Sequence, residues 1–233
     1  MASTPPNNEA FLREVDDELR RDQIMGYWTR WGRWLVGVVV LGLAAFGGYL
    51  WWDNAQKTQA GVEGEQLAAA LDSIEVGGLT AAKTKLDALS TSPNAGYRAT
   101  AKIAAAGLLL EKGDLKAAAS AFGAVALDTD APQSLRDLAL VRQTAAEFDT
   151  MKPEAIVARL KPLAVSGNAW FGSAGEMVAI SYIKMGKTDL AGKLFGEIGK
   201  QENVPETIRS RAIQMAGVLG VDAVDPATKD KSQ

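Results

Sequence analysis

The sequence predicts an all-α protein in which a single N-terminal transmembrane helix is followed by a solenoid of helical hairpins. Two observations predict this. Residues 34–52 form a run of 19 residues without a charge, and at about 1.5 Å per residue a helix of that length spans the ~30 Å apolar core of a bilayer. The rest of the chain repeats small and large apolar residues about every 36 positions, which is typical of stacked helical units.

The ends of the uncharged run carry aromatic side chains. Five of the six tryptophans of the protein lie at its two edges. An amphipathic ring is stabilised at the boundary between lipid headgroups and hydrocarbon, so this distribution favours a membrane span over a buried helix. The aromatic residues at the edges are Trp28, Trp31, Trp34, Tyr49, Trp51 and Trp52.

The residues around the span predict that it is retained and give it a direction. A cleaved signal has a short basic leader and an apolar run of about 7–15 residues, whereas here 33 residues with six acids precede a longer run. Arg20, Arg21, Arg30 and Arg33 precede it, and only Lys57 follows in a similar window. Because basic residues stay on the cytoplasmic side, we expect a cytoplasmic N-terminus and residues 53–233 on the far side.

The composition excludes several classes of function. The chain contains no cysteine and no histidine, so disulfides, the commonest metal ligands and the commonest general base are absent. After residue 52, 20 basic and 22 acidic residues give a charge of −2 without a basic cluster, which argues against nucleic-acid binding. No catalytic or phosphate-binding motif is present. We therefore predict a non-enzymatic protein with no cofactor, metal or small-molecule substrate.

A repeat of helix, short turn and helix organises the exported part. A small or apolar residue and a larger one four positions later recur in the second helix of each unit: Ala82 and Leu86, Ala118 and Phe122, Ile156 and Leu160, Ala191 and Phe195. Five residues before each first member lies a turn, at Gly77, Gly113, Met151 and Gly186, and upstream of the turns lie Ala70, Ala106, Ala145 and Ala179. This pattern resembles the tetratricopeptide repeat, although the third unit requires a longer turn.

The uncharged run and the repeat together predict four parts of the chain. Residues 1–33 are a cytoplasmic segment, 34–52 the transmembrane helix, 53–220 the repeat domain and 221–233 a disordered tail without apolar periodicity. We expect helix pairs near 60–90, 95–127, 132–165 and 169–200. A further helix headed by Pro205 and running to about Leu219 should cap the array.

The segment before the span contains a second apolar pattern. Phe11, Leu12, Val15 and Leu19 form one stripe of a helix over residues 9–25, which is either an ordinary surface helix or a docking helix for a cytoplasmic partner.

This segment also resembles the YfgM-like family of Gram-negative inner-membrane proteins, which places a divergent repeat domain after a single span. The residues that carry the resemblance are Phe11, Glu14, Val15, Asp16, Glu18, Leu19, Arg20, Arg21 and Asp22.

The resemblance implies a location and partners. Members of that family are associated with the SecYEG protein-conducting channel and with a membrane-anchored periplasmic chaperone that has a prolyl-isomerase-like domain. By resemblance, the chain would lie in the bacterial inner membrane and help pass exported chains from the channel to periplasmic folding factors. The alternative is a scaffold subunit of another envelope-assembly complex. The resemblance implies no catalytic residues.

Three sets of residues are candidate contact sites. The first helices of such units line a concave surface that binds peptides, which nominates Ile103, Leu110, Arg142, Glu176, Ile180 and Ile183, although ordinary core packing is the favoured alternative for the four aliphatic members. Trp170 and Phe171 are adjacent aromatics, of which one could be an exposed anchor or a ridge between units. Gly37, Ala44 and Gly48 share a face of the span that would permit close helix packing, or would face lipid.

Overall fold

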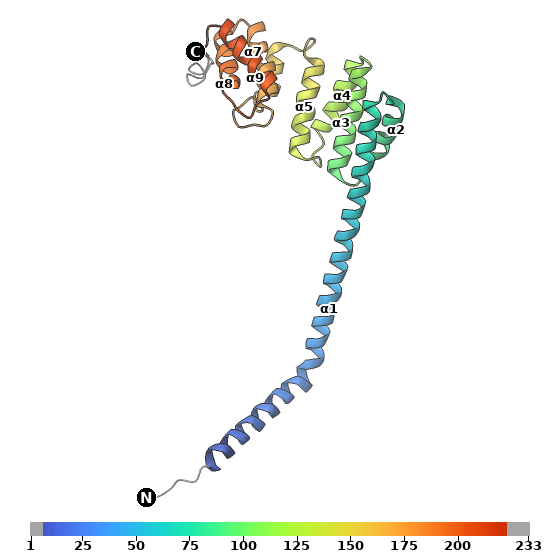
Figure 1. The fold of residues 1–233 in the computed structure, drawn as a ribbon, viewed down its shortest axis with the longest axis vertical. Helices are drawn as coiled ribbons and strands as arrows, with labels where there is room; N and C mark the ends of the chain where they lie inside the picture. The colour runs from blue at the N-terminus through green and yellow to red at the C-terminus, as the bar shows by residue number, and fades with distance from the viewer. Residues whose placement is uncertain (1–6, 223–233) are drawn as a thin grey trace, which may run out of the picture. The chain divides into compact units, whose positions relative to one another are not determined.

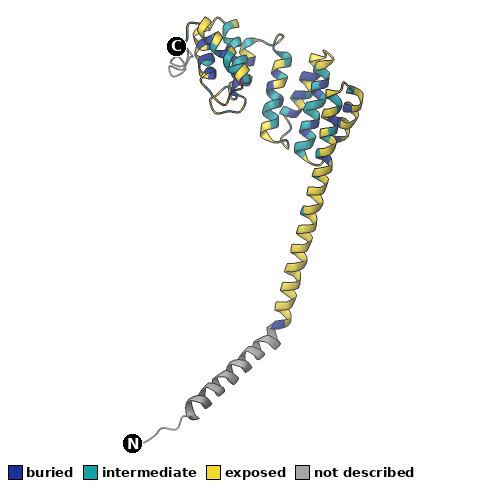
Figure 2. Ribbon diagram, in the orientation of Figure 1, coloured by how far each residue is buried: buried dark blue, intermediate teal, exposed yellow. Residues whose placement is uncertain are grey.

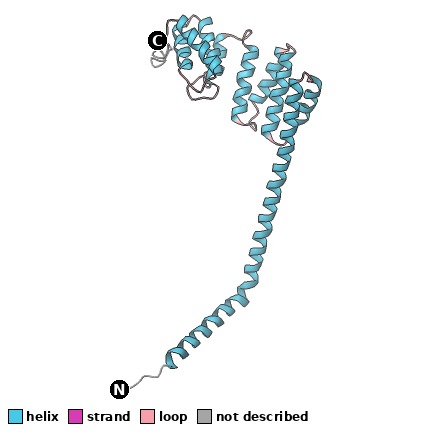
Figure 3. Ribbon diagram, viewed as in Figure 1, coloured by secondary structure: helices cyan, strands magenta, loops and turns pink. Residues whose placement is uncertain are grey.

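The computed structural model describes the backbone of residues 7–222 and the side chains of residues 32–222. Within this part of the chain every regular element is an α-helix, which confirms the predicted fold class (Figures 1 and 3). The helices are α1 (Asn7–Glu75), α2 (Leu79–Leu89), α3 (Ala95–Glu111), α4 (Leu115–Ala126), α5 (Gln133–Glu147), α6 (Pro153–Leu160), α7 (Phe171–Lys184), α8 (Thr188–Gly199) and α9 (Glu206–Val218).

The chain divides into two compact units, Met1–Gly61 and Val62–Gln233. The first unit contains most of α1, in which the stretch from Gly32 onward is long and apolar enough to be a candidate membrane span. Its large apolar side chains are exposed (Figure 2), for example Trp34 at 74% and Leu41 at 72%. Such exposure suits a lipid environment.

The small-residue face predicted for the span is exposed. A Cβ added at Gly37 or Gly48 would meet nothing within 4 Å, and Ala44 is exposed, so this small-residue face is open to lipid or to another helix. The side chains of the proposed docking stripe (Phe11, Leu12, Val15 and Leu19) lie outside the described residues. Of the proposed tail, 221–233, Val221 and Asp222 are described, and Val221 packs against a core cluster; residues from 223 onward lie outside the described residues.

The second unit is built from helix pairs that stack side by side, as the sequence repeat predicts (Figure 1). The end of α1 pairs with α2, and α3, α5 and α7 precede α4, α6 and α8 respectively. The eight residues that define the repeat in the second helices, from Ala82 to Phe195, are all 2% exposed or less. Because they close the contacts between helices, the repeat in the sequence corresponds directly to a repeat in the core.

A glycine in the left-handed conformation ends four of the first helices. Gly77, Gly113, Gly186 and Gly220 have φ between 72° and 78°, a region that L side chains rarely adopt. After each glycine, the next amide donates to a carbonyl five residues back, as Asp114 does to Leu109 at 2.9 Å, which satisfies carbonyls at the helix end. Gly220 lies 34 residues after Gly186, so α9 occupies the place of the first helix of a fifth unit.

The third unit departs from the others in its turn and in its small residue. Five residues separate α5 from α6, whereas three residues form each of the other turns within a pair, and Pro153 begins α6. The sequence pattern placed Ala145 in the contact, but Ala145 is exposed and Thr144 is fully buried. Thr144 lies seven residues before the turn at Met151, the spacing that Ala70, Ala106 and Ala179 have in their units.

The buried hydroxyl of Thr144 is satisfied within its own helix. Thr144 Oγ1 donates to the carbonyl of Leu140 at 2.8 Å. A side chain that bonds in this way tolerates burial, since an unpaired hydroxyl would cost on the order of 1–3 kcal/mol. Threonine therefore takes the position that alanine holds in the neighbouring units.

This register leads to a paired prediction for α5. Thr144→Glu should lower the free energy of unfolding by about 3 kcal/mol, because it buries a charge without a partner, whereas Ala145→Glu should change it by no more than about 0.5 kcal/mol. Urea unfolding followed by circular dichroism measures both. Equal losses would show that both positions face the core.

Five clusters of buried residues run through the second unit, each drawn from consecutive helices. The cluster nearest the C-terminus joins α7, α8 and α9, and close contacts at glycines lie beside it. A Cβ added at Gly172 would lie 2.8 Å from Val204 Cγ1, and one at Gly192 would lie 2.9 Å from Val221 Cγ2. These glycines let the segment after α9 and the loop before it pack directly on helix backbone.

Gly192 and Gly217 form a matched pair for a stability test. Gly192→Ala should destabilise the domain by about 1–3 kcal/mol, because the added methyl displaces Val221 and Leu219. Gly217→Ala, on exposed helix surface with nothing within 4 Å of the new Cβ, should stabilise it by about 0.5–1 kcal/mol. Thermal unfolding of the two variants measures the difference, and a stabilising Gly192→Ala would contradict the packing described.

Candidate partner-binding surface

The first helices of the units form one continuous layer. Among the described residues, α3 contacts α5, α5 contacts α7 and α7 contacts α9, whereas no two of α2, α4, α6 and α8 contact one another. Helices on the inner side of a curved array lie closer together than those on the outer side. The first helices therefore form the inner layer, where a solenoid commonly binds its partners.

Three positions of each unit, on the first helix or just after its end, fall on one side of this layer. They lie nine, six and two residues before the turn residue, and at about 100° per residue they fall within roughly 60° of one another. All are exposed or half-buried. We call this surface the first-helix face, and it consists of Ala68, Leu71, Glu75, Ala104, Gly107, Glu111, Arg142, Ala145, Asp149, Met177, Ile180 and Lys184.

The middle of the first-helix face is apolar, with two small and two large residues. Leu71, Gly107, Ala145 and Ile180 occupy equivalent positions six residues before their turns. Leu71 is 44% exposed, and a Cβ added at Gly107 would meet nothing within 4 Å. A partner backbone can therefore approach α3 closely, between larger apolar side chains on α1 and α7.

One edge of the first-helix face is acidic. Glu75, Glu111 and Asp149 lie two residues before successive turns and are exposed, and none of them forms an ion pair with the described residues. The fourth member, Lys184, places its ammonium 4.3 Å from the centre of the Phe148 ring, an attractive cation–π contact. The edge consequently offers three free carboxylates to a basic partner.

The six residues proposed for partner binding divide into three groups. Arg142 and Ile180 belong to the first-helix face; Arg142 is exposed, whereas Ile180 is half-buried and also packs against the cluster of α7, α8 and α9. Ile103 and Glu176 are half-buried beside it. Leu110 and Ile183, three residues before their turns, are half-buried and pack against core clusters. Their equivalents in the other units, Ile74 and Phe148, pack in the same way, which assigns this repeat position to the contact between helices.

Glu176 holds the last two first helices together. Both Nε and Nη2 of Arg211 on α9 donate to its carboxylate, the latter at 2.7 Å. Glu176 is the more buried partner, with 17% of its side chain exposed against 53% for Arg211. The hydrogen bond and the charge of Glu176 raise the pKa of Arg211 above its ordinary value, against a smaller opposing effect of burial. This carboxylate is therefore engaged within the domain.

The adjacent aromatics Trp170 and Phe171 point into different clusters. Trp170 precedes α7, its amide donates to Asn168 Oδ1 at 2.8 Å, and its half-buried ring packs against the cluster between α5 and α7. Phe171 is 1% exposed and lies in the cluster between α7 and α9. Phe171 is thus a core residue, and only Trp170 retains surface for a partner.

Sequence reasoning missed most of the first-helix face. Ala68, Ala104 and Gly107 were overlooked because small residues carry no functional signal of their own; their distance from the turn glycines would have found them. Between residues 32 and 222, no group of three or more acidic residues is placed to hold a metal ion. The chemistry of this surface is that of recognition through apolar contact and charge.

Comparison with known proteins identifies the repeat. A family model described as a tetratricopeptide repeat-like domain matches residues 26–215, which is more than half of the chain. No curated protein and no solved structure matches the chain.

Proposed function

The chain belongs to the family of tetratricopeptide repeat-like domains, and on this premise we propose that it is a membrane-anchored interaction protein that helps pass exported proteins to periplasmic chaperones. Domains of this class act as protein-interaction scaffolds rather than as enzymes. The observation that carries the proposal is the first-helix face, an apolar strip with a free acidic edge. Its partners are exported chains, a SecYEG-like channel and a periplasmic chaperone with a prolyl-isomerase-like domain.

The candidate span supports a function at the membrane surface. α1 supplies both the apolar stretch from Gly32 and, from Val62 to Glu75, the first helix of the repeat array. A tether that confines a binding domain to a membrane raises its effective concentration for partners there, without any new contact. Weak contacts on the first-helix face would then suffice beside a channel.

The chemistry of the first-helix face supports an unfolded client. An exported chain that has not folded exposes apolar segments, and those with lysine or arginine nearby complement the carboxylates of Glu75, Glu111 and Asp149. Small residues at Gly107 and Ala145 leave room for varied side chains. Recognition of this kind is tolerant of sequence, as a protein that serves many exported chains requires.

The proposed orientation places the repeat domain in the periplasm. A reporter that is active only in the periplasm should be active when it is fused after Leu219, and inactive when it is fused after Arg33. The reverse result would place the first-helix face in the cytoplasm and remove exported chains from its possible clients.

Site-specific cross-linking in intact membranes tests the function. A photo-reactive residue at Ala145, on the first-helix face, should cross-link to exported chains or to channel subunits. The same residue at Ala158, exposed on the second helix α6, is the matched control and should give far less of these products.

The competing function is a scaffold in another envelope-assembly complex. Cross-links from Ala145 to cell-wall or outer-membrane assembly proteins, with none to channel subunits or exported chains, would favour that scaffold and overturn the proposal.

A further inference from the structure

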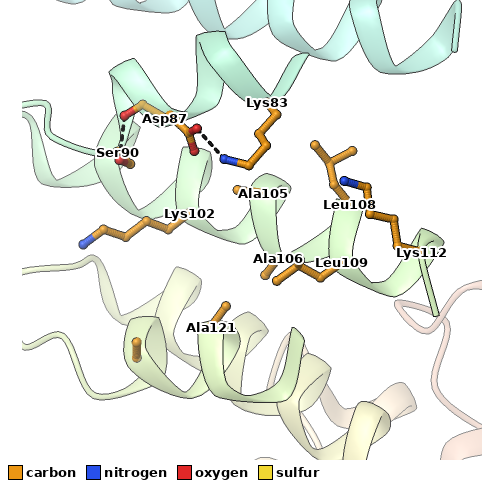
Figure 4. A pocket seen from close by; sticks show the side chains of 11 residues that line it. Lys83, Asp87, Ser90, Lys102, Ala105, Ala106, Leu108, Leu109, Lys112 and Ala121 are labelled. Atoms are coloured by element: carbon orange, nitrogen blue, oxygen red, sulfur yellow. Dashed lines mark hydrogen bonds and ion pairs between the residues drawn. The ribbon is translucent and has the colours of Figure 1, made fainter. Parts of the chain in front are cut away.

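A groove of about 370 Å³ lies on the second-helix side of the array, between α2 and α4 (Figure 4). α3 forms its floor with Ala105, Ala106 and Leu109, and Ala121 and Ala124 on α4 form one wall. Most of the lining is alanine or leucine, so the groove is apolar and its small side chains let another chain approach closely.

The groove and the first-helix face lie on different sides of α3. The groove uses Lys102, Ala105, Ala106, Leu108, Leu109 and Lys112 of this helix, whereas the first-helix face uses residues 104, 107 and 111. At about 100° per residue the midpoints of the two sets are roughly 150° apart. A partner in the groove would therefore leave the first-helix face open.

Lysines surround the apolar floor. Lys83 pairs with Asp87 at 2.5 Å, but the ammonium groups of Lys102 and Lys112 form no ion pair or hydrogen bond with the described residues. In Figure 4 these two residues lie toward opposite ends of the groove; the Lys102 side chain extends away from it and that of Lys112 turns back beside Leu108. Three lysines against one aspartate give the groove a local charge of +2, although acids outnumber bases by 19 to 17 between residues 62 and 222.

We propose that this groove is a second docking site, which binds an amphipathic helix of a partner protein whose apolar stripe is flanked by aspartate or glutamate. An amphipathic helix presents apolar residues every three or four positions, and an apolar groove between helices accepts such a stripe. Charge complementarity selects acidic flanks, because Lys102 and Lys112 are the groove's unpaired charges.

The spacing of the two lysines defines the ligand further. They are ten residues apart on α3, or about 15 Å along the helix axis. A partner helix lying along α3 would carry carboxylates about ten or eleven residues apart, with the apolar stripe between them. A small anion would satisfy one lysine and leave the apolar floor exposed to water.

A second copy of this chain is a less suitable occupant. The free acids at the edge of the first-helix face could reach the groove of another copy, but that contact joins two different surfaces. Contacts of this kind do not close into a dimer by twofold symmetry and lead to rings or open chains. The occupant of the groove is therefore a separate partner protein that carries the acidic helix.

The binding test uses two synthetic peptides and the full chain in lipid nanodiscs. Both peptides are helices of about 18 residues with one leucine stripe; the first has glutamate flanks and the second lysine flanks. Fluorescence anisotropy should show the glutamate peptide binding at least about tenfold more tightly. Lys102→Glu/Lys112→Glu should reverse this preference, whereas Lys116→Glu/Lys193→Glu, which makes the same change of charge elsewhere on the surface, should preserve it.

A steric variant separates the groove from general electrostatics. Ala124 is exposed and lines the groove, so Ala124→Trp should fill it and abolish glutamate-peptide binding without changing the melting temperature.

Equal binding of both peptides, or binding that survives both Ala124→Trp and the charge reversal at Lys102 and Lys112, would overturn the proposal. Self-association of the chain that the charge reversal removes would overturn it in favour of a second copy. Since the groove is distinct from the first-helix face, cross-linking at Ala145 is unaffected by these outcomes.

Discussion

Phe195→Ala should lower the free energy of unfolding of the repeat domain by about 3–5 kcal/mol. Phe195 is 1% exposed and belongs to the cluster that includes Phe171 and Ile198. Removing the ring loses its transfer free energy and leaves a cavity, and helix ends fixed by Gly186 and Gly220 limit how far the neighbours can close it. Urea unfolding monitored by circular dichroism is the measurement.

Leu190→Ala on the same helix is the control. Leu190 is 46% exposed, so its truncation should cost no more than about 0.5 kcal/mol. Comparable losses for the two variants would mean that α8 does not bury the face assigned to it. Because each unit of a solenoid contacts only its neighbours, the Phe195→Ala loss should come mainly from α7 to α9.

Leu41→Arg/Leu43→Arg should release the protein from the membrane. Each arginine at the centre of a spanning helix disfavours insertion by about 2.5–3.5 kcal/mol, so two together disfavour it by roughly 5–7 kcal/mol. The measurement is the fraction of the full chain that stays with membranes after alkaline carbonate extraction. We expect the unaltered protein to remain in the membrane fraction and the variant to appear in the supernatant.

Val62→Arg/Val76→Arg adds the same charge outside the predicted span. Both valines are exposed in the second unit, at 49% and 84%, so this variant should remain with the membrane. Retention of Leu41→Arg/Leu43→Arg in the membrane pellet would show that α1 around residue 41 does not cross the bilayer.

The repeat architecture could be predicted from the sequence because its signals are local. A glycine that must adopt positive φ, as at Gly113, and a buried residue such as Ala118 five positions later stay at a fixed distance along the chain. The third unit lacks the glycine, and an alanine-rich sequence then offers several choices of register. A recurring alanine favours Ala145 for the contact, whereas burial of Thr144 is made possible by its hydrogen bond to the Leu140 carbonyl, which a pattern of small residues does not show.

The contact surfaces were less predictable because they depend on neighbouring helices. Ile183 and Ile180 have the same side chain three residues apart, yet only the second belongs to the first-helix face. The groove is harder still, since Lys83, Lys102 and Ala124 come from three helices and none of them stands out in the sequence. Close approaches such as that of Gly192 to Val221 depend on which backbone lies opposite, and this is decided in three dimensions.

The way the buried clusters are assembled has a consequence for biosynthesis. No cluster in the described second unit requires a residue from a distant part of the chain, since each draws on consecutive helices. A nascent chain could complete α1 with α2, then α3 with α4, in the order in which they emerge, without waiting for its C-terminus. Folding can thus be vectorial, beginning at the end of α1 and ending with α9, so that each cluster buries its apolar surface as its helices are completed.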